Sequence, residues 1–230
     1  MAIINDTEFG RIILRRTRLA RQARLKLDAR GVVSISVPMR APLYLARQLL
    51  EESRPKLRQL LGKIKASRPA YQEGELIGKS HILRFEQNSD DSYAHHLKQG
   101  HLIISCPANV NQTILEATIH KGVSQALRLQ ATSYLPRRLR QLADTHGFTY
   151  AKTRFSSAGT RWGSCSSEGT ISLNIWLMQL PFEIIDYVLV HELCHTRQLN
   201  HSAEFWDLVA ACCPNYKTLR QQLRAHQPSA

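Results

Sequence analysis

Residues 181–206 read PFEIIDYVLVHELCHTRQLNHSAEFW, and this stretch decides the fold. Its leading proline is typical of the first turn of a helix. The residues that follow, up to His195, are apolar on nearly every side of such a helix, which is the pattern of a buried helix. We therefore expect a buried helix that carries His191, Glu192 and His195 near its end.

The end of this helix contains an H-E-x-x-H motif, His191-Glu192-Leu193-Cys194-His195. Positions four apart lie one turn apart on the same helix face, so the two imidazoles can bind one zinc ion. Glu192 would lie beside a metal-bound water and take its proton. Burying three such polar groups is costly unless they have partners, and a metal supplies them. The alternative is a helix end whose polar groups simply reach solvent.

A catalytic zinc site typically has three protein ligands and one open position. His201 follows His195 at the interval of H-E-x-x-H-x-x-G-x-x-H sites, and Glu204 is the competing ligand. This chain has Gln198 where those sites have glycine, so we expect Asn200 to adopt the left-handed conformation that returns the chain. We favour His201 as the ligand. Glu204 would lie in the first turn of the next helix, behind Ser202 as its cap.

The rest of the chain alternates between strand and helix patterns. The apolar–polar alternation of residues 24–27 and 33–37 predicts a hairpin with one Arg-rich face. Helical spacing predicts a helix at 43–67 with a break or a kink at Pro55, and a helical region at about 112–145 with a break near Pro136. Further expected elements are strands at 75–86, 101–106, 149–155, 160–164 and 170–177, a polar loop at 87–100, and helices at 203–212 and 216–224. We expect a basic, β-rich N-terminal region over residues 1–110 and a catalytic domain over residues 111–230.

The net charge of +13 lies mostly in the N-terminal part. Residues 1–70 hold 16 Lys and Arg against 5 Asp and Glu, a balance of +11, and residues 71–230 hold 15 against 13, a balance of +2. This asymmetry fits either a solvated face or attraction to a polyanion such as nucleic acid or a nucleotide. The five cysteines form no CxxC pair, which favours a reducing cytoplasm. No segment has the pattern of a signal peptide or a membrane span.

Further motifs accompany the histidines. They are Arg161-Trp162-Gly163-Ser164-Cys165-Ser166, Asn174, Ile185-Asp186-Tyr187-Val188, Asn200-His201-Ser202 and Phe205-Trp206. Together with the H-E-x-x-H motif they resemble the YgjP-like metallohydrolase family, a relative of the WLM and SprT groups of zincin-type metallopeptidases. The resemblance implies a zincin-like α+β fold, with a backing helix, a small sheet and an active-site helix behind the basic N-terminal part. It also implies that His201 is the third ligand.

Four further residues are candidates for substrate binding. Trp162, Gly163 and Ser164 are expected on a strand that lines the cleft and pairs with an extended substrate, although a structural hairpin with a packed tryptophan fits equally. Arg197 is a candidate to neutralise an anionic substrate, or else a solvent-facing charge at a helix end.

The function predicted from the sequence is that of a zinc-dependent hydrolase with one zinc ion per chain. A metallopeptidase acting on peptides or proteins is favoured. One alternative is a phosphoanhydride hydrolase that acts on a nucleotide at the same site, with the N-terminal basic residues holding the phosphates. Another is a nucleic-acid-binding protein with a structural zinc, which the vacant fourth ligand position argues against.

Overall fold

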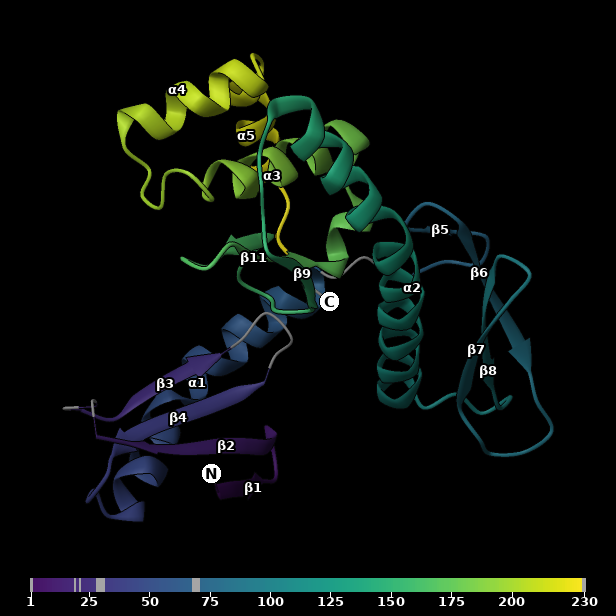
Figure 1. The fold of residues 1–230 in the computed structure, drawn as a ribbon. Helices are drawn as coiled ribbons and strands as arrows, with labels where there is room; N and C mark the ends of the chain where they lie inside the picture. Colours follow the sequence, from purple (N-terminus) through teal and green to yellow (C-terminus); the bar gives the residue numbers. More distant parts are fainter. Residues whose placement is uncertain (1, 19, 21, 28–31, 68–70, 229–230) are drawn as a thin grey trace. The chain divides into compact units, whose positions relative to one another are not determined.

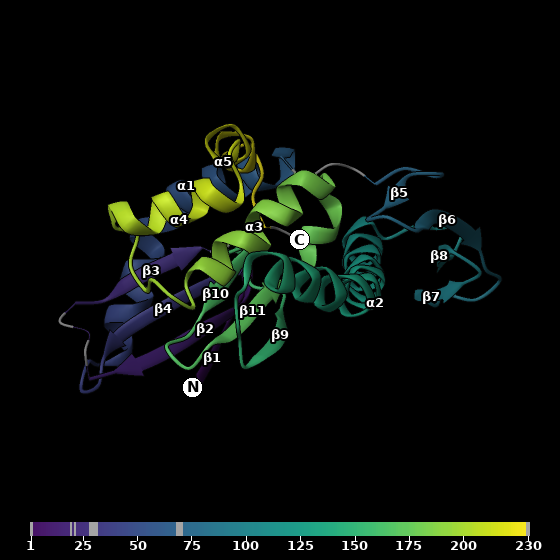
Figure 2. The same cartoon turned by 45° about the horizontal axis from the view of Figure 1, so that its top comes forward.

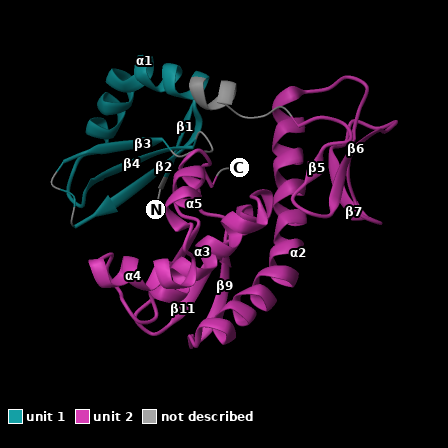
Figure 3. Cartoon of the chain, turned by 90° about the horizontal axis from the view of Figure 1, so that it is seen from above, with its two compact units in different colours: residues 1–70 teal, residues 71–230 magenta. Residues whose placement is uncertain are grey.

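The computed structural model describes residues 2–18, 20, 22–27, 32–67 and 71–228 (Figure 1). The chain forms two compact units, residues 1–70 and 71–230 (Figure 3). This division differs from the boundary that we expected at residue 110. The reason is that the strands after residue 71 bury their apolar side chains in the same core as the helix that follows them. No helix among the described residues is both long enough and apolar enough to cross a bilayer.

The first unit is a four-stranded sheet covered by one helix. Its elements are β1 (Ala2–Asp6), β2 (Gly10–Thr17), β3 (Arg24–Leu27), β4 (Val33–Pro38) and α1 (Leu43–Ser67), with strand order β1-β2-β4-β3. The antiparallel pairing of β3 with β4 confirms the expected hairpin, whose turn lies outside the described residues. Of the break or kink expected at Pro55, the break is wrong, because α1 runs through this proline. Apolar side chains on both sides of that proline, Leu50 and Leu57, hold the helix against the sheet.

Several basic residues of the first unit have structural partners. The guanidinium of Arg54 binds the Asp6 carboxylate at 2.7 Å and the Glu8 carboxylate at 3.0 Å. Arg58 also binds Glu8, and Arg16 donates to the backbone carbonyls of residues 39 and 41. Some of the positive charges in the N-terminal part are therefore neutralised by ion pairs within the first unit.

The second unit begins with a small sheet packed on a long helix. The sheet contains β5 (Leu76–Ile77), β6 (His81–Gln87), β7 (Ala94–Lys98) and β8 (His101–Cys106) in the order β5-β6-β8-β7. The expectation of a loop throughout residues 87–100 is wrong, because β7 lies within it and pairs antiparallel with β8. As an edge strand, β7 exposes most of its length, so its sequence lacks a run of buried apolar residues.

Helix α2 (Gln112–His146) separates this sheet from the rest of the unit. The Asn111 side chain caps its start, and Gly147 ends it with φ 68°. The helix continues through Pro136, so the expected break is wrong, although its axis bends along its length (Figure 1). On one side α2 packs against β7 and β8, and on the other against β9 and α3 (Figure 2).

The remaining elements form a second small sheet and three helices. They are β9 (Lys152–Ser156), β10 (Gly163–Cys165), β11 (Thr170–Asn174), the 3-10 helix η1 (Ile175–Gln179), α3 (Phe182–Cys194), α4 (Ala203–Cys212) and α5 (Tyr216–Arg224). The order β10-β11-β9 leaves β10 at an edge. The strand expected over 170–177 ends early, because the side-chain Oδ1 of Asn174 accepts from the Trp176 backbone N–H and caps the start of η1. The mixed α+β architecture with small sheets agrees with the α+β part of the expected fold class.

Candidate metal centre

The candidate site is at the end of α3. This helix is buried along most of its length, and its last turn carries His191 and Glu192, with His195 at the C-cap position. Because His195 follows His191 by four residues, both rings lie on one face, with centroids 4.9 Å apart. The apolar sequence of α3 thus fixes where two imidazoles lie.

After His195 the chain turns back without a left-handed residue. The backbone N–H groups of Arg197 and Gln198 both donate to the Cys194 carbonyl, at 3.1 and 3.0 Å. Among the described non-glycine residues only Gln99 has a positive φ, so the expectation of a left-handed Asn200 is wrong. A tight turn of ordinary conformations replaces the glycine, and it brings His201 back to the end of the helix.

Three imidazole nitrogens converge after this turn. The Nε2 atom of His201 lies 3.2 Å from Nε2 of His195 and 3.2 Å from Nε2 of His191. Among the described residues, these histidines form a group of side chains able to hold one metal ion. Glu204 is not part of this group; it lies in the first turn of α4, and its carboxylate accepts from the Ser202 hydroxyl. Ser202 stands at the N-cap but makes no side-chain capping bond.

The geometry of the three nitrogens fits a metal ion. Two ligands at the usual Zn–N distance of about 2.0–2.1 Å from a tetrahedral centre lie roughly 3.3 Å apart. The observed 3.2 Å spacings match this value. Nδ1 of His195 donates to the Gln198 carbonyl at 2.9 Å, which leaves Nε2 deprotonated and directed at the other rings. Burial, with the two neighbouring imidazoles, lowers the pKa of His191 to about 3, so its ring is neutral as a ligand must be.

Two aromatic side chains of α4 support the histidines. Phe205, fully buried, stacks on the ring of His195 with centroids 4.4 Å apart. Trp206 stacks on the ring of His201 at 5.6 Å. The sequence analysis named both residues only as part of the resemblance, because the H-E-x-x-H motif alone does not reveal which residues hold the rings.

Glu192 is buried against the edge strand. It is 5% exposed, and burial raises the pKa of its carboxyl to about 8, while the charge of Arg161 opposes the rise. Its Oε2 atom makes no hydrogen bond with any described residue. A Cβ at Gly163 would lie 2.6 Å from Glu192 Oε1, so a side chain at Gly163 would displace this carboxylate. The glycine of β10 thus leaves the space that Glu192 fills.

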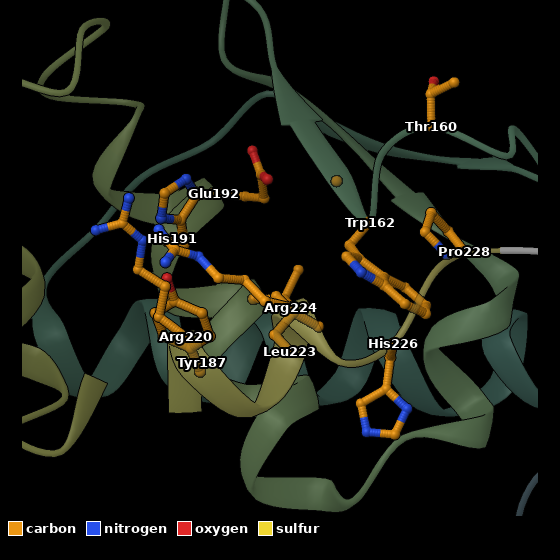
Figure 4. Close-up of a pocket in the computed structure, with 12 residues that line it drawn as sticks. Thr160, Trp162, Tyr187, His191, Glu192, Arg220, Leu223, Arg224, His226 and Pro228 are labelled. Atoms are coloured by element: carbon orange, nitrogen blue, oxygen red, sulfur yellow. The ribbon is translucent and has the colours of Figure 1, made fainter. Parts of the chain in front are cut away.

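A pocket of about 410 Å³ opens beside His191 and Glu192 (Figure 4). Trp162 and Gly163 line one side, as the sequence analysis expected. Ser164 does not line it and pairs with Ser172 of β11. Arg197 is not in the lining either, because its guanidinium donates to the Gly147 carbonyl and stacks on Phe148, at the end of α2.

The opposite side of the pocket comes from α5, which the sequence analysis did not connect with the site. Arg220, Leu223 and Arg224 line it. The spacing of Arg220 and Arg224, four apart, was visible in the sequence, but the return of α5 to α3 is a tertiary feature.

Asn174 was named only as part of the resemblance. Its Nδ2 donates to the carbonyls of Ala158 and Arg161, at 2.7 and 2.8 Å, and so fixes the loop that leads into β10.

Comparison with known proteins gives a family. Residues 21–226 match the model of the YgjP-like metallopeptidase domain. Among proteins with curated descriptions, none matches the chain. One similar solved structure is the zymogen of the metallopeptidase abylysin from Pyrococcus abyssi, with 25% identity over 39% of this chain and 91% of that one, and a TM-score of 0.37. Another is the zymogen of the metallopeptidase jannalysin from Methanocaldococcus jannaschii, with 17% identity, 38% and 95% coverage, and a TM-score of 0.32. The match to the family model covers most of the chain, and the chain therefore belongs to the YgjP-like metallopeptidase family and is a metal-dependent hydrolase.

Proposed function

We propose that this protein is a zinc-dependent peptidase that holds one zinc ion with His191, His195 and His201. The observation that carries the proposal is the convergence of three Nε2 atoms at the spacing of zinc ligands. Membership of a metallopeptidase family implies a divalent metal. Three nitrogen ligands, without a fourth ligand among the residues that the structure describes, are typical of catalytic rather than structural zinc.

Glu192 acts as the general base. Zinc, when bound, supplies Lewis acidity that polarises the substrate carbonyl. The Glu192 carboxylate accepts a proton from the attacking water and then gives that proton to the leaving nitrogen. A carboxyl whose pKa is raised by burial is suited to holding a proton near neutral pH. Gly163 keeps the carboxylate in place, because any larger residue there would occupy its position.

Strand β10 binds the substrate backbone. Trp162 O accepts from Asn174 N at 2.9 Å, and Ser166 N donates to Thr170 O at 3.0 Å. In an antiparallel ladder such bonds involve every second residue, so the backbone groups of Gly163 and Cys165 are directed away from β11. β10 is an edge strand, and an extended peptide can pair with these outward groups beside Glu192. A peptide has the regular backbone that such an edge recognises, which favours peptide over nucleotide substrates.

The test of the general base is a Glu192→Gln variant. We expect it to retain stoichiometric zinc but to lose hydrolysis of a casein-derived peptide by at least 10²-fold, the lower range of general base contributions. Elemental analysis and single-turnover peptide cleavage would measure both. Glu183→Gln, at the other end of α3 and outside the pocket, is the matched control. Unchanged turnover in Glu192→Gln would eliminate Glu192 as the base, and release of phosphate from nucleoside triphosphates without any peptide cleavage would overturn the peptidase proposal.

The third ligand is tested by comparing His201→Ala with Glu204→Gln. We expect His201→Ala to lose most of its zinc, because two imidazoles remain, and Glu204→Gln to keep one ion per chain. Inductively coupled plasma mass spectrometry after dialysis against a weak chelator measures the difference. The reverse result would make Glu204 the ligand.

A further inference from the structure

Two arginines on the α5 side of the pocket indicate a substrate preference, which rests on the proposed peptidase function. Arg220 and Arg224 both line the pocket that contains His191 and Glu192. They lie one helical turn apart on α5, so both guanidinium groups can face the same space. Figure 4 shows both side chains extending toward the end of the pocket where His191 lies.

The helix is held so that these arginines face the pocket. Leu219 of α5 is buried, Leu223 packs against the core, and the ring of Tyr216 stacks on Trp206 at 5.5 Å. The guanidinium of Arg220 lies 4.4 Å from the Trp206 ring centroid. Arg220 is therefore positioned by packing rather than by an ion pair.

No carboxylate among the described residues neutralises this pair. The ion pairs of the described residues include Arg54, Arg58, Arg84 and Arg138, but neither Arg220 nor Arg224. Arg138 shows the contrast, because it binds both oxygens of the Asp186 carboxylate, at 2.8 and 2.6 Å. Like charges four apart on a helix repel each other. The helix dipole favours Arg224 in the last turn of α5 but gives no reason for Arg220 beside it.

The acid that lines the pocket is Glu192, which is buried and carries the proposed base function. The outer lining combines the apolar side chains of Trp162, Leu223 and Pro228 with the polar Thr160 and His226. A site with both apolar and polar walls, and with two guanidinium groups that no described carboxylate pairs with, suits an amphipathic chain that carries a carboxylate, since guanidinium binds carboxylate in a bidentate manner. We propose that Arg220 and Arg224 form a subsite for a substrate carboxylate, so that the enzyme prefers peptides with an acidic side chain or a free C-terminal carboxylate next to the cleaved bond.

The experiment uses pairs of peptides that differ only in this charge. One pair carries Glu or Gln beside the cleaved bond, and a second pair ends in a free carboxylate or in a carboxamide. With the zinc-loaded full chain, we expect kcat/KM to be at least tenfold higher for the charged member of one pair. A preference within the Glu/Gln pair would mean that the subsite binds an acidic side chain, and a preference within the second pair would mean that it binds the C-terminal carboxylate. Arg224→Gln should reduce this ratio several-fold, and Arg220→Gln with Arg224→Gln should bring it to about one. Replacing both residues by Lys should restore part of the preference.

Binding separates this inference from the proposed peptidase function. Each peptide is titrated into Glu192→Gln protein while tryptophan fluorescence is recorded, because Arg220 contacts Trp206. Tighter binding of the charged peptide that disappears in the double Arg→Gln variant would support the subsite, whether or not any peptide is cleaved. Absence of cleavage would contradict only the peptidase proposal. Arg140→Gln, exposed on α2 and outside the pocket, is the control and should keep the preference. Equal affinity for both members of each pair, or binding of a nucleoside triphosphate in place of the charged peptide, would overturn the subsite.

Discussion

Gly163 and Glu192 lie so close that neither residue can change size without moving the other. The ideal Cβ position on Gly163 is 2.6 Å from Oε1 and 2.7 Å from Cγ of Glu192. Contacts below 3.0 Å are not tolerated by real Cβ atoms, so the carboxylate or the strand would have to shift. The glycine of β10 is required by the neighbouring Glu192 carboxylate rather than by its own backbone conformation, since its φ is not positive.

This contact predicts the effect of Gly163→Ala. We expect kcat to fall by about 10²-fold, the typical effect of displacing a catalytic group by about 1 Å, while the zinc content stays unchanged. Gly62→Ala is the control, because a Cβ there meets nothing within 4 Å, and it should leave kcat unaltered. Steady-state kinetics with parallel metal analysis measures both variants. A fully active Gly163→Ala protein would mean that β10 can move without disturbing Glu192.

At the scale of elements, helix α3 could be predicted from the sequence, but the path of the chain around its end could not. The apolar run before His191 and the spacing of the motif are local features, and the structure has the helix where they indicate it. The convergence of His201 was expected from its interval, but the path to it was not. Its turn is made by backbone N–H groups that donate to the Cys194 carbonyl, and every residue except proline carries such a donor. Sequence patterns do not encode such bonds.

The other misjudged elements have a common physical cause. Tertiary packing carried α1 through Pro55 and α2 through Pro136, where local propensity favours a break. Strand β7 was missed because it lies at the edge of its sheet and pairs only with β8. Its side chains are exposed or half-buried, so its sequence has no buried apolar run that would indicate a strand. The return of α5 to α3, which places Arg220 in the lining of the same pocket as His191, depends on contacts between helices that are not adjacent in sequence.

The contact between β1 and α1 predicts how the first unit responds to acid. Arg54 holds the Asp6 carboxylate at 2.7 Å and lowers its pKa from 3.8 to about 2. Because folding favours the ionised form, this contribution is complete above about pH 4 and is lost as the pH falls toward 2. We therefore expect wild-type protein to lose stability over this range more steeply than Asp6→Asn.

Urea unfolding between pH 2 and 5, monitored by hydrogen exchange in residues 2–18, measures this difference. Asp91→Asn, an exposed position in the second unit, is the control and should follow the wild type. Parallel pH curves for wild type and Asp6→Asn would show that the Arg54–Asp6 pair does not contribute to folding.

The whole molecule has two hydrophobic cores, one in each compact unit. All three histidines that converge belong to the second unit. A bound ion stabilises only the structure that binds it, by RT ln(1 + [L]/Kd). Metal binding and the stability of the first unit are therefore expected to be independent properties of the chain.

Calorimetry with and without chelator tests this expectation. We predict two unfolding transitions, of which removal of zinc lowers only one. At free zinc about a hundredfold above Kd, the stabilisation of that transition is about 2.7 kcal/mol. Asp6→Asn at pH 4 should lower the temperature of the other transition, which belongs to the first unit. A single transition that responds to both changes would mean that the two cores unfold together.

The turn between His195 and His201 has a consequence for how such sites are recognised. Its contacts come from backbone amides that donate to the Cys194 carbonyl and from the Gln198 carbonyl, which selects the tautomer of His195. The identity of the side chain at position 198 is therefore free to vary, whereas the number of residues between the two histidines is not. A motif search that demands glycine at this place would overlook chains of this kind, and one that counts only the interval would find them.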